Sequence, residues 1–384
     1  MTAANVSGLP TAVQVLGDQA DKLRCLECGG RLELTFLSER PGYPELGPDG
    51  TLSCIGCAEH YPVVAGTPRM LTSEHRRRLP AAYPLAVETL SRHIDSSDQP
   101  PNAEVAIKQL TADSFAYEWE QFGSLRDEWA KNFADYMQPH SPESLAGQDV
   151  LDIGTGSGRH SFHAAYAGAH VVAVDLGASI DVARRNLPPS VLTVQANAEA
   201  LPFESASFDL ACRSACCTHL PDPDRALHSI ARYARPGGNV HVYLYWVPEQ
   251  PWHRRVLTVV TAARRVTVRL PHRVLHSLCY PLAVALQVVF VVPFRALRHR
   301  PRGRGVAAAC LSRPTPTIRS ASWSTTSSTA SRPPLERRYA ADEVRHVLAA
   351  VGLEDIVVLP NHGWVGEGRR AVATNPPGAG RPRG

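Results

Sequence analysis

Residues 150–175 read VLDIGTGSGRHSFHAAYAGAHVVAVD and decide the fold. An apolar run leads into glycines at alternate positions, Gly154, Gly156 and Gly158. A short helical pattern follows, and a second apolar run ends on Asp175. The order predicts a strand, a tight glycine turn, a helix and a second strand. Glycine lets the backbone turn sharply against a ligand, a helix N-terminus offers free N–H groups, and an acid ending the second strand suits two ribose hydroxyls. The stretch therefore predicts an α/β domain that holds an adenosine.

The spacing of the glycines separates two kinds of adenosine ligand. A dinucleotide fingerprint, G-x-G-x-x-G, would place its third glycine at position 159, which is Arg159. Here the third glycine comes one position earlier, and Asp152 precedes the first glycine by two. The resulting pattern, D-x-G-x-G-x-G, resembles the first motif of class I methyltransferases that use S-adenosylmethionine (SAM).

Further motifs downstream strengthen this resemblance. A strand is expected at 191–196, a fourth at about 207–213, a helix at about 222–234 and a fifth strand at 239–245. Between these elements lie NAEALPF at 197–203, SFD at 207–209, His219-Leu220 and RPGG at 235–238. The series is similar to the methyltransferase family that includes the ubiquinone and menaquinone enzymes, over roughly residues 148–245 with a weaker echo at 339–372. The chain departs from that family at Asn197, where the family has Asp, and at 214–218, which replaces a glycine and aliphatic residues.

The resemblance implies a Rossmann-like, seven-stranded sheet flanked by helices, with SAM bound at the glycine turn. The glycines would line the methionine and ribose of SAM, and Asp175 would accept from the ribose hydroxyls. Asp152 would face the ammonium, and Asn197 with Ala198 would hold the adenine edge. The expected SAM contacts are Asp152, Gly154, Thr155, Gly156, Gly158, Asp175, Leu176, Asn197, Ala198 and Arg213. His219 is the candidate general base, with a structural role as the alternative, because methyl transfer needs a base only for a nucleophile with a proton of high pKa.

A second signal lies near the N-terminus, where Cys25-x-x-Cys28 and Cys54-x-x-Cys57 are separated by 25 residues. Two such knuckles suit a closed, four-cysteine structural zinc site, with disulfides as the alternative. No secretory signal is recognisable at the start of the sequence, which favours a reducing, cytoplasmic compartment. Residues 20–72 resemble the small zinc-ribbon protein that activates tRNA and release-factor methyltransferases. We therefore expect Zn²⁺ to fold this module, and the module to buttress the methyltransferase domain.

The chain, at 384 residues, is long enough for two domains. The predicted organisation is a zinc ribbon at 20–72, a helical linker or cap at 73–147, and the methyltransferase domain at 148–384. Aromatic residues in the linker, including Tyr117 and Trp119, indicate a helix that either packs on the core or covers the cofactor.

A basic insertion is predicted at 250–335, before the last helix and strands. It carries 14 arginines and no Asp or Glu, whereas the rest of the chain has 26 basic and 36 acidic residues, a net charge of −10. Within it, the uncharged stretch 277–294 is read as a cap helix over the pocket, with a membrane-surface anchor as the alternative and a membrane span as the weakest option. Residues 311–334 hold 12 Ser or Thr and are expected to be disordered. Order should resume with a helix from about Ala341 and strands at 354–359 and about 369–374.

The sequence therefore predicts an enzyme that transfers a methyl group from SAM to O, N or C of a small or amphipathic acceptor. Contact with a membrane surface through 252–300 is considered, nucleic acid is not expected as a partner, and the oligomeric state is open. The alternatives are a tRNA or protein methyltransferase, disfavoured because 213–216 lack an N-P-P-Y-type motif, and a non-catalytic SAM-binding scaffold.

Overall fold

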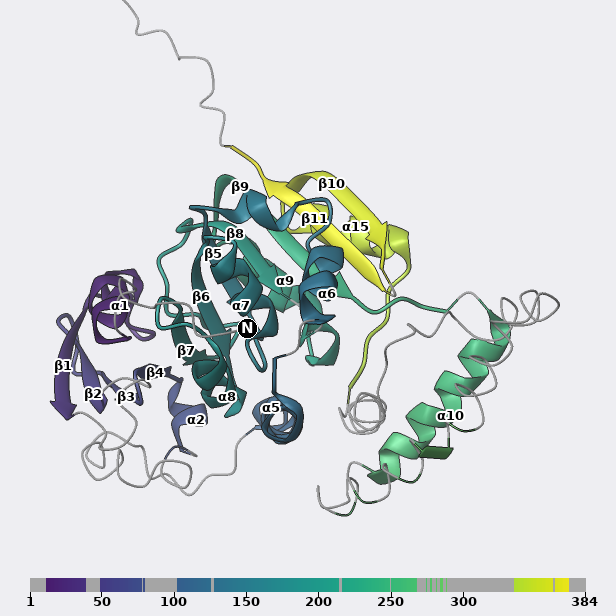
Figure 1. Ribbon diagram of the computed structural model, residues 1–384, viewed down its shortest axis with the longest axis horizontal. Coiled ribbons are helices and arrows are strands. Elements are labelled where there is room, and N and C mark those ends of the chain that lie inside the picture. Colours follow the sequence, from purple (N-terminus) through teal and green to yellow (C-terminus); the bar gives the residue numbers. More distant parts are fainter. Residues whose placement is uncertain are drawn as a thin grey trace, which may run out of the picture. The chain divides into compact units, whose positions relative to one another are not determined.

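The computed structural model describes residues 12–38, 49–77, 102–125, 128–213, 216–248, 250–267, 335–361 and 363–372, with a few single positions elsewhere. The chain forms two compact units. The first comprises Met1–Gln109, Ser124–Val247 and Leu335–Gly384, and the second comprises Leu110–Gly123 and Pro248–Pro334. The first unit contains both predicted sites (Figure 1).

The first unit is built on one sheet whose strand order is β1-β2-β3-β4-β7-β6-β5-β8-β9-β11-β10. The bounds of the central strands are β5 Asp149–Ile153, β6 His170–Asp175, β7 Leu192–Ala196 and β8 Phe208–Arg213. These four strands run parallel to one another, and β8 also pairs in parallel with β9. On the far side lie β9 Ala234–Leu244, β11 Trp364–Arg370 and β10 Leu353–Pro360. The α/β fold is the one expected from the sequence.

The seven strands expected for the methyltransferase part, β5–β11, are present, and the sheet continues for four more, which was not predicted. These are β1 Leu32–Ser38, β2 Asp49–Cys54, β3 His60–Val64 and β4 Thr67–Met70. They form an antiparallel meander, and β4 then pairs in parallel with β7, with Arg69 opposite Gln195 and Met70 opposite Ala196. An unpaired edge strand exposes N–H and C=O groups that seek partners, so β4 covers what would otherwise be the free edge of β7.

Helices cover both faces of the central strands, because alternate residues of each strand point to opposite faces. Val150, Val171 and Leu210 contribute to one buried cluster with α6 Glu128–Tyr136, α7 Arg159–Tyr166 and α8 Ser179–Asn186. Leu151, Val172 and Val240 contribute to the other, with α9 Pro223–Ala231 and α15 Ala341–Ala350.

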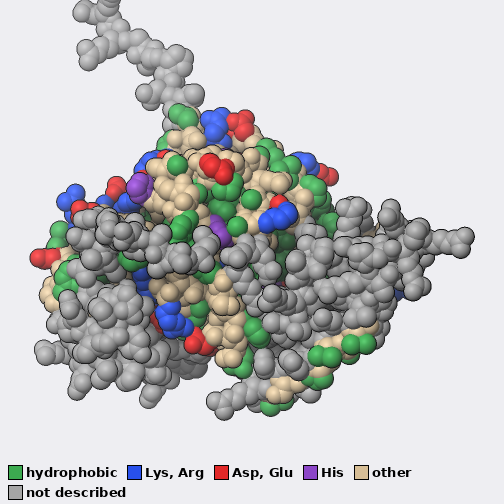
Figure 2. Space-filling model, viewed as in Figure 1, with side chains coloured by type: hydrophobic (Ala, Val, Ile, Leu, Met, Phe, Trp, Pro, Cys, Tyr) green, Lys and Arg blue, Asp and Glu red, His purple; other side chains and the backbone are tan. Residues whose placement is uncertain are grey.

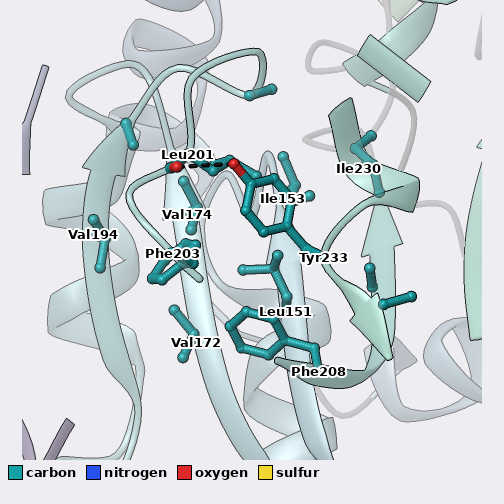
Figure 3. Packing of buried hydrophobic residues seen from close by; sticks show 14 of the residues in the cluster. Leu151, Ile153, Val172, Val174, Val194, Leu201, Phe203, Phe208, Ile230 and Tyr233 are labelled. Carbon is teal, nitrogen blue, oxygen red and sulfur yellow. Dashed lines mark hydrogen bonds between the residues drawn. The ribbon is translucent and has the colours of Figure 1, made fainter. Parts of the chain in front are cut away.

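This second cluster is close-packed around the aromatic rings of Phe203, Phe208 and Tyr233 (Figure 3). The hydroxyl group of Tyr233 donates to the carbonyl of Leu201 at 2.9 Å, which satisfies a buried polar group inside the core. The same cluster extends to Leu16 and Leu23 in the N-terminal segment, from α1 Ala12–Gln19 and beside η1 Ala20–Lys22. The cysteine-bearing strands and the central strands therefore share one hydrophobic core.

Two strands differ in extent from the sequence-based expectation. The last strand, β11, begins at Trp364 rather than near 369, and Gly366 and Gly368 lie within it. Glycine normally weakens a strand, but here a Cβ on Gly366 would lie 2.9 Å from Val344 of α15, so the close packing requires glycine. Similarly, β9 begins at Ala234 rather than 239, because its pairing with β8 continues past a register shift.

The second unit contains most of α5 Ala103–Phe122, including Tyr117 and Trp119, and α10 Pro251–Thr267. Apart from single positions, the predicted cap helix or anchor at 277–294 lies outside the described residues, as does all of 311–334. None of the helices within the described ranges is both long and apolar enough to cross a membrane. On the face shown in Figure 2, the described Lys and Arg side chains lie interspersed with Asp and Glu.

Candidate functional site

The glycine turn after β5 has the backbone conformation that its sequence requires. Gly154, Gly156 and Gly158 have φ angles of 74°, 59° and 82°, the left-handed region that favours glycine. The N–H groups of Gly154 and Thr155 donate to the carbonyl of Val174 in β6, at 2.7 and 3.0 Å. A Cβ on Gly158, the N-cap of α7, would lie 2.9 Å from the Cγ of Leu187. The backbone therefore fixes the turn, and Leu187 leaves no room for a side chain at Gly158.

Asp175, at the end of β6, connects this turn to the next loop. One carboxylate oxygen accepts from the N–H of Gly156 at 3.0 Å, and the other accepts from the N–H of Gly177 at 2.9 Å. An ionised carboxylate only accepts hydrogen bonds, so Asp175 is suited to donors such as ribose hydroxyls. The carbonyl of Leu176 accepts from the side-chain amide of Gln195 at 3.0 Å. The loop after β6 is thus held from both sides.

Asp152 faces inward rather than toward an open surface. It is 2% exposed, and its carboxylate accepts from the hydroxyl of Ser161 at 2.6 Å, while Ser161 lies 2.9 Å from the hydroxyl of Thr155. Burial raises the pKa of Asp152. The predicted contact between Asp152 and the ammonium of SAM stays a prediction, and the observed role is to bind the glycine turn to the first turn of α7.

Beside Asp152 lies a cavity of about 20 Å³, enough for one water molecule. Its lining is mostly apolar and includes Phe133 and Tyr136 of α6 with Tyr243 of β9. The Tyr136 ring packs against Tyr243 and His160, with ring centroids 4.5 and 4.9 Å apart. This space is a narrow gap in the packing of α6 on the sheet, too small to hold an acceptor.

The loop after β7 presents the residues expected at the adenine edge. Asn197 and Ala198 are both 9% exposed; the Asn197 side-chain oxygen accepts from the N–H of Glu199 at 3.2 Å, and the carbonyl of Ala198 accepts from Ser229 at 3.0 Å. Glu199 in turn forms an ion pair with the buried Lys108 of α5 at 2.9 Å and a second with Arg225 of α9. The loop is therefore fixed by charged partners on two helices.

His219 ends the short helix η4 Cys216–His219 and is 2% exposed. Its Nδ1 lies 2.9 Å from the carbonyl of Leu335, and since a carbonyl can only accept, Nδ1 carries the proton. In the neutral ring, Nε2 is then the basic nitrogen. The geometry is compatible with either predicted role of His219. Arg213 ends β8, pairing with Ile153 and Val242, but its side chain and those of Cys216 and Cys217 lie outside the described residues.

The comparisons with known proteins agree with this geometry. Residues 151–242 match the family described as "Methyltransferase domain". Residues 151–242 form a methyltransferase domain. It is of class I, the kind that uses SAM, and the curated relatives include methyltransferases with different acceptors.

Two curated relatives and one solved structure illustrate the match. Demethylmenaquinone methyltransferase from Clavibacter sepedonicus is 35% identical over 114 residues, 29% of this chain and 46% of the relative. Malonyl-[acyl-carrier protein] O-methyltransferase from Erwinia billingiae is 35% identical over 136 residues, 35% of this chain and 52% of the relative. The structure of 1,6-didemethyltoxoflavin-N1-methyltransferase from Burkholderia thailandensis is 18% identical, with a TM-score of 0.40, over 73% of this chain and 98% of that one. The chain spans about half the length of the curated relatives it matches.

Outside the methyltransferase domain, the four cysteines come together. The Sγ atoms of Cys25, Cys28, Cys54 and Cys57 all lie within 4.8 Å of one another. The Cys25–Cys57 and Cys28–Cys54 separations are 3.6 and 3.4 Å, far longer than the roughly 2 Å of a disulfide. Four thiolates about 2.3 Å from a tetrahedral Zn²⁺ would stand about 3.8 Å apart. The donor set and its spacing thus fit a closed zinc site.

The surroundings of the cysteines also fit a metal. The N–H of Gly56 donates to the Sγ of Cys54 at 3.3 Å, and a Cβ on Gly30 would lie 3.1 Å from the Sγ of Cys28. The Tyr61 hydroxyl lies 3.3 Å from the Sγ of Cys25. Hydrogen bonds to coordinating sulfur orient the ligands and reduce the charge that they carry.

Two residues near the methyltransferase site were missed from the sequence. Gln195 supports the loop after β6, and Arg69 of β4 contacts Gln195 with Nη1 to Oε1 at 3.3 Å. Gln195 carried a usable signal, because it is a long polar side chain within the otherwise apolar strand LTVQA. Arg69 carried none, since its partner lies 126 residues away.

Proposed function

We propose that this protein is an enzyme that transfers the methyl group of SAM to a small or amphipathic acceptor. The observation that carries the proposal is the left-handed glycine turn closed onto the carboxylate of Asp175. In this arrangement the carboxylate of Asp175, at the end of β6, accepts from the N–H groups of Gly156 and Gly177 beside glycines in the left-handed conformation. That combination is suited to an adenosine whose ribose presents two hydroxyls.

The residues of this site bind and orient the donor. Asp175 accepts from the ribose hydroxyls, the glycines admit the sugar and the methionine portion, and Asn197 with Ala198 meets the adenine edge. When bound, SAM supplies an electrophilic methyl group on a sulfonium. The protein therefore contributes mainly by holding the nucleophile in line and excluding water. If the acceptor carries a proton of high pKa, Nε2 of His219 is the group that removes it.

The class of acceptor is part of the proposal. The two relatives described above are named for a quinone precursor and for a malonyl group on a carrier protein, acceptors with little in common. We propose a small or amphipathic acceptor because it is compatible with the names of both relatives and with the absence of an N-P-P-Y-type motif at 213–216.

The first test is binding of SAM and of S-adenosylhomocysteine to the zinc-loaded full chain, measured by calorimetry. Asp175→Ala removes acceptors for two hydroxyls and should weaken binding at least about 10- to 150-fold, since losing one hydrogen bond to a charged group costs roughly 1.5–3 kcal/mol. Asp355→Ala is the matched control. It removes an exposed acid of β10 that pairs with Arg369 of β11, and the variant should bind both ligands with wild-type affinity. A wild-type protein without affinity for either ligand would disprove the proposal.

The acceptor itself can be found by labelled-methyl transfer. The enzyme is incubated with isotopically labelled SAM and fractionated extracts, and mass spectrometry identifies what becomes heavier. Label in a small molecule supports the proposal. Label in tRNA or protein selects the alternative enzyme class, and binding of SAM without transfer to any fraction selects a scaffold.

We further propose that Cys25, Cys28, Cys54 and Cys57 bind one structural Zn²⁺. Four thiolates fill a tetrahedral shell and leave no position for substrate. Metal analysis of the purified chain should give one zinc per molecule, and a chain that is fully folded with no bound metal would contradict this assignment.

We also propose contact between α10 and an anionic membrane surface. Arg254 and Arg255 are exposed on this helix, and Val259 is 69% exposed. A helix with basic and exposed apolar residues suits the interface of an anionic bilayer. Co-sedimentation with phosphatidylserine vesicles should exceed that with phosphatidylcholine vesicles and fall in an Arg254→Glu/Arg255→Glu variant. Equal sedimentation with both lipids would refute the contact.

A further inference from the structure

We propose that Gln195, oriented by Arg69 of the cysteine-bearing module, is a positioning residue for the SAM-binding loop. The module would then set the affinity for SAM through a defined pair of side chains, in addition to stabilising the fold. This inference rests on the proposed function, because it assumes that the loop after β6 holds the adenosine.

The path from the module to the loop consists of two hydrogen bonds. Arg69 lies on β4 directly opposite Gln195 on β7, and it is fully buried. Its Nη1 donates to Oε1 of Gln195 at 3.3 Å, and Nε2 of Gln195 donates to the carbonyl of Leu176 at 3.0 Å. Because the guanidinium can only donate, it fixes the amide with its oxygen toward Arg69 and its NH₂ group toward Leu176.

Arg69 is itself held in one orientation. Its Nη2 donates to Oδ1 of Asp181 at 2.6 Å and to the carbonyl of Val64 at 3.2 Å. Asp181 lies in the first turn of α8, a few residues beyond Leu176. Arg69 therefore holds both ends of the segment 176–181. It contacts Leu176 through Gln195 and Asp181 directly.

The position of this segment matters for the ligand. Leu176 follows Asp175 directly, and the N–H of Gly177 donates to the Asp175 carboxylate. A shift in the Leu176 carbonyl moves the peptide group that joins Leu176 to Gly177. It therefore changes the hydrogen bond by which Gly177 orients the Asp175 carboxylate. A misplacement of a few tenths of an ångström at a ribose-binding acid weakens two ligand hydrogen bonds together.

The same strand junction offers a matched control. Thr67 of β4 and Thr193 of β7 are fully buried, and their hydroxyls form a hydrogen bond of 2.8 Å. This bond also joins the module to the methyltransferase domain, but it lies further from the carboxyl end of β7 and has no described contact with the loop at 176–181. Loss of either bond should lower stability, whereas only loss of the Gln195 bond should change SAM affinity.

The experiment compares Gln195→Glu and Thr193→Val in the zinc-loaded full chain. The glutamate retains an acceptor for Arg69 but has no N–H for the carbonyl of Leu176, so the module stays paired while the loop loses its support. We expect the dissociation constant of S-adenosylhomocysteine to rise about five- to tenfold in Gln195→Glu and to stay within about twofold of wild type in Thr193→Val. Gln195→Met, which loses both bonds, should weaken binding at least as much.

Steady-state kinetics and hydrogen exchange add readouts that a purely structural role would not change. Gln195→Glu should raise the KM for SAM and leave kcat at saturating SAM within about twofold. Because coupling is reciprocal, S-adenosylhomocysteine should slow amide exchange at 67–70 in wild type and not in Gln195→Glu. The proposal is overturned if Gln195→Glu binds like Thr193→Val or if ligand leaves exchange at 67–70 unchanged. Absence of binding by wild type would instead reject the proposed function itself.

Discussion

The two sides of the central parallel strands are held in different ways. On the β7 side, β4 adds to the sheet through a short parallel pairing at Arg69 and Met70. On the other side, β11 pairs with β9 in antiparallel fashion along the whole of 364–369. The β7 side lacks extended backbone pairing and depends on buried side chains, including the Thr67–Thr193 hydrogen bond and the Arg69–Asp181 ion pair.

This difference predicts which side can influence the cofactor. The module on the β7 side carries the proposed zinc site, and its Arg69 reaches the loop after β6 through Gln195. The β9–β11 side is fixed by its own backbone and by α15. Its described hydrogen bonds run to β9, to the C-terminal ends of α6 and α9 and to Tyr339 rather than to the loop at 176–181. Perturbing the first side should change both stability and SAM affinity, and perturbing the second should change stability alone.

The largest effect should come from the metal site. Cys54→Ser removes one of the four proposed zinc ligands. Because folding of such modules is driven by metal binding, we expect the free energy of unfolding to fall by about 3 kcal/mol or more, which corresponds to a fall in melting temperature on the order of 10 °C. Zinc content should fall below one per chain, and SAM affinity should fall with it. The measurements are metal analysis, thermal denaturation and calorimetry on the same samples.

The neighbouring Ser53→Ala provides the control for Cys54→Ser. It removes a hydrogen bond to His60 on the same pair of strands and leaves the ligands intact, so zinc content and SAM affinity should be unchanged. The comparison between the two sides of the sheet would fail if Cys54→Ser lost its zinc while retaining wild-type stability and SAM affinity.

A smaller effect is expected from Gly366→Ala on the opposite side. The added Cβ would lie 2.9 Å from Cγ1 of Val344 and 3.1 Å from Cδ1 of Leu348, both in the fully buried interface of α15. Overpacking of this kind costs about 1–3 kcal/mol, measured as a lower denaturant midpoint. Affinity for S-adenosylhomocysteine should stay within about twofold of wild type.

The double variant Gly366→Ala/Val344→Ala tests whether the clash is the cause. Val344→Ala removes the obstructing methyl groups, so the double variant should be more stable than the sum of the single losses predicts. A marked loss of SAM affinity in Gly366→Ala would show that this side of the sheet also controls the cofactor loop.

The sequence predicted what depends on local pattern and missed what depends on long-range pairing. The glycine turn, Asp175 and the paired cysteine knuckles were recognisable because a left-handed backbone or a metal needs particular residue types at fixed spacing. The addition of β4 to β7 was not recognisable, because Arg69 and Gln195 lie 126 residues apart in the sequence and become partners only in the folded chain.

The smallest effect concerns a histidine cluster on the β9–β11 side. Glu367 of β11 accepts from Nε2 of His140 at 2.7 Å. Nδ1 of His241 lies 2.9 Å from the same carboxylate, and Nε2 of His241 lies 2.7 Å from the carbonyl of Tyr136. These bonds join the end of α6 to two strands. The hydrogen bond with Glu367 raises the pKa of His140, while burial opposes it. Burial alone would raise the pKa of Glu367, but the bonds from His140 and His241 outweigh it and lower its pKa.

The directions of these shifts define a pH window. The raised pKa of His140 contributes stability that is fully present below the unfolded value of about 6.5 and is lost as the pH rises through the folded value. The lowered pKa of Glu367 contributes stability that is present above about 4.3 and is lost as the pH falls through the folded value. His140→Ala should therefore lower the free energy of unfolding by about 1 kcal/mol near pH 5.5, a small amount because solvent screens a partly exposed ion pair. The loss should be smaller at pH 8.5, because His140 is then uncharged. Thermal melts of both proteins across this range measure the difference. A difference that is as large at pH 8.5 as at pH 5.5 would show that His140 contributes by packing rather than by its charge.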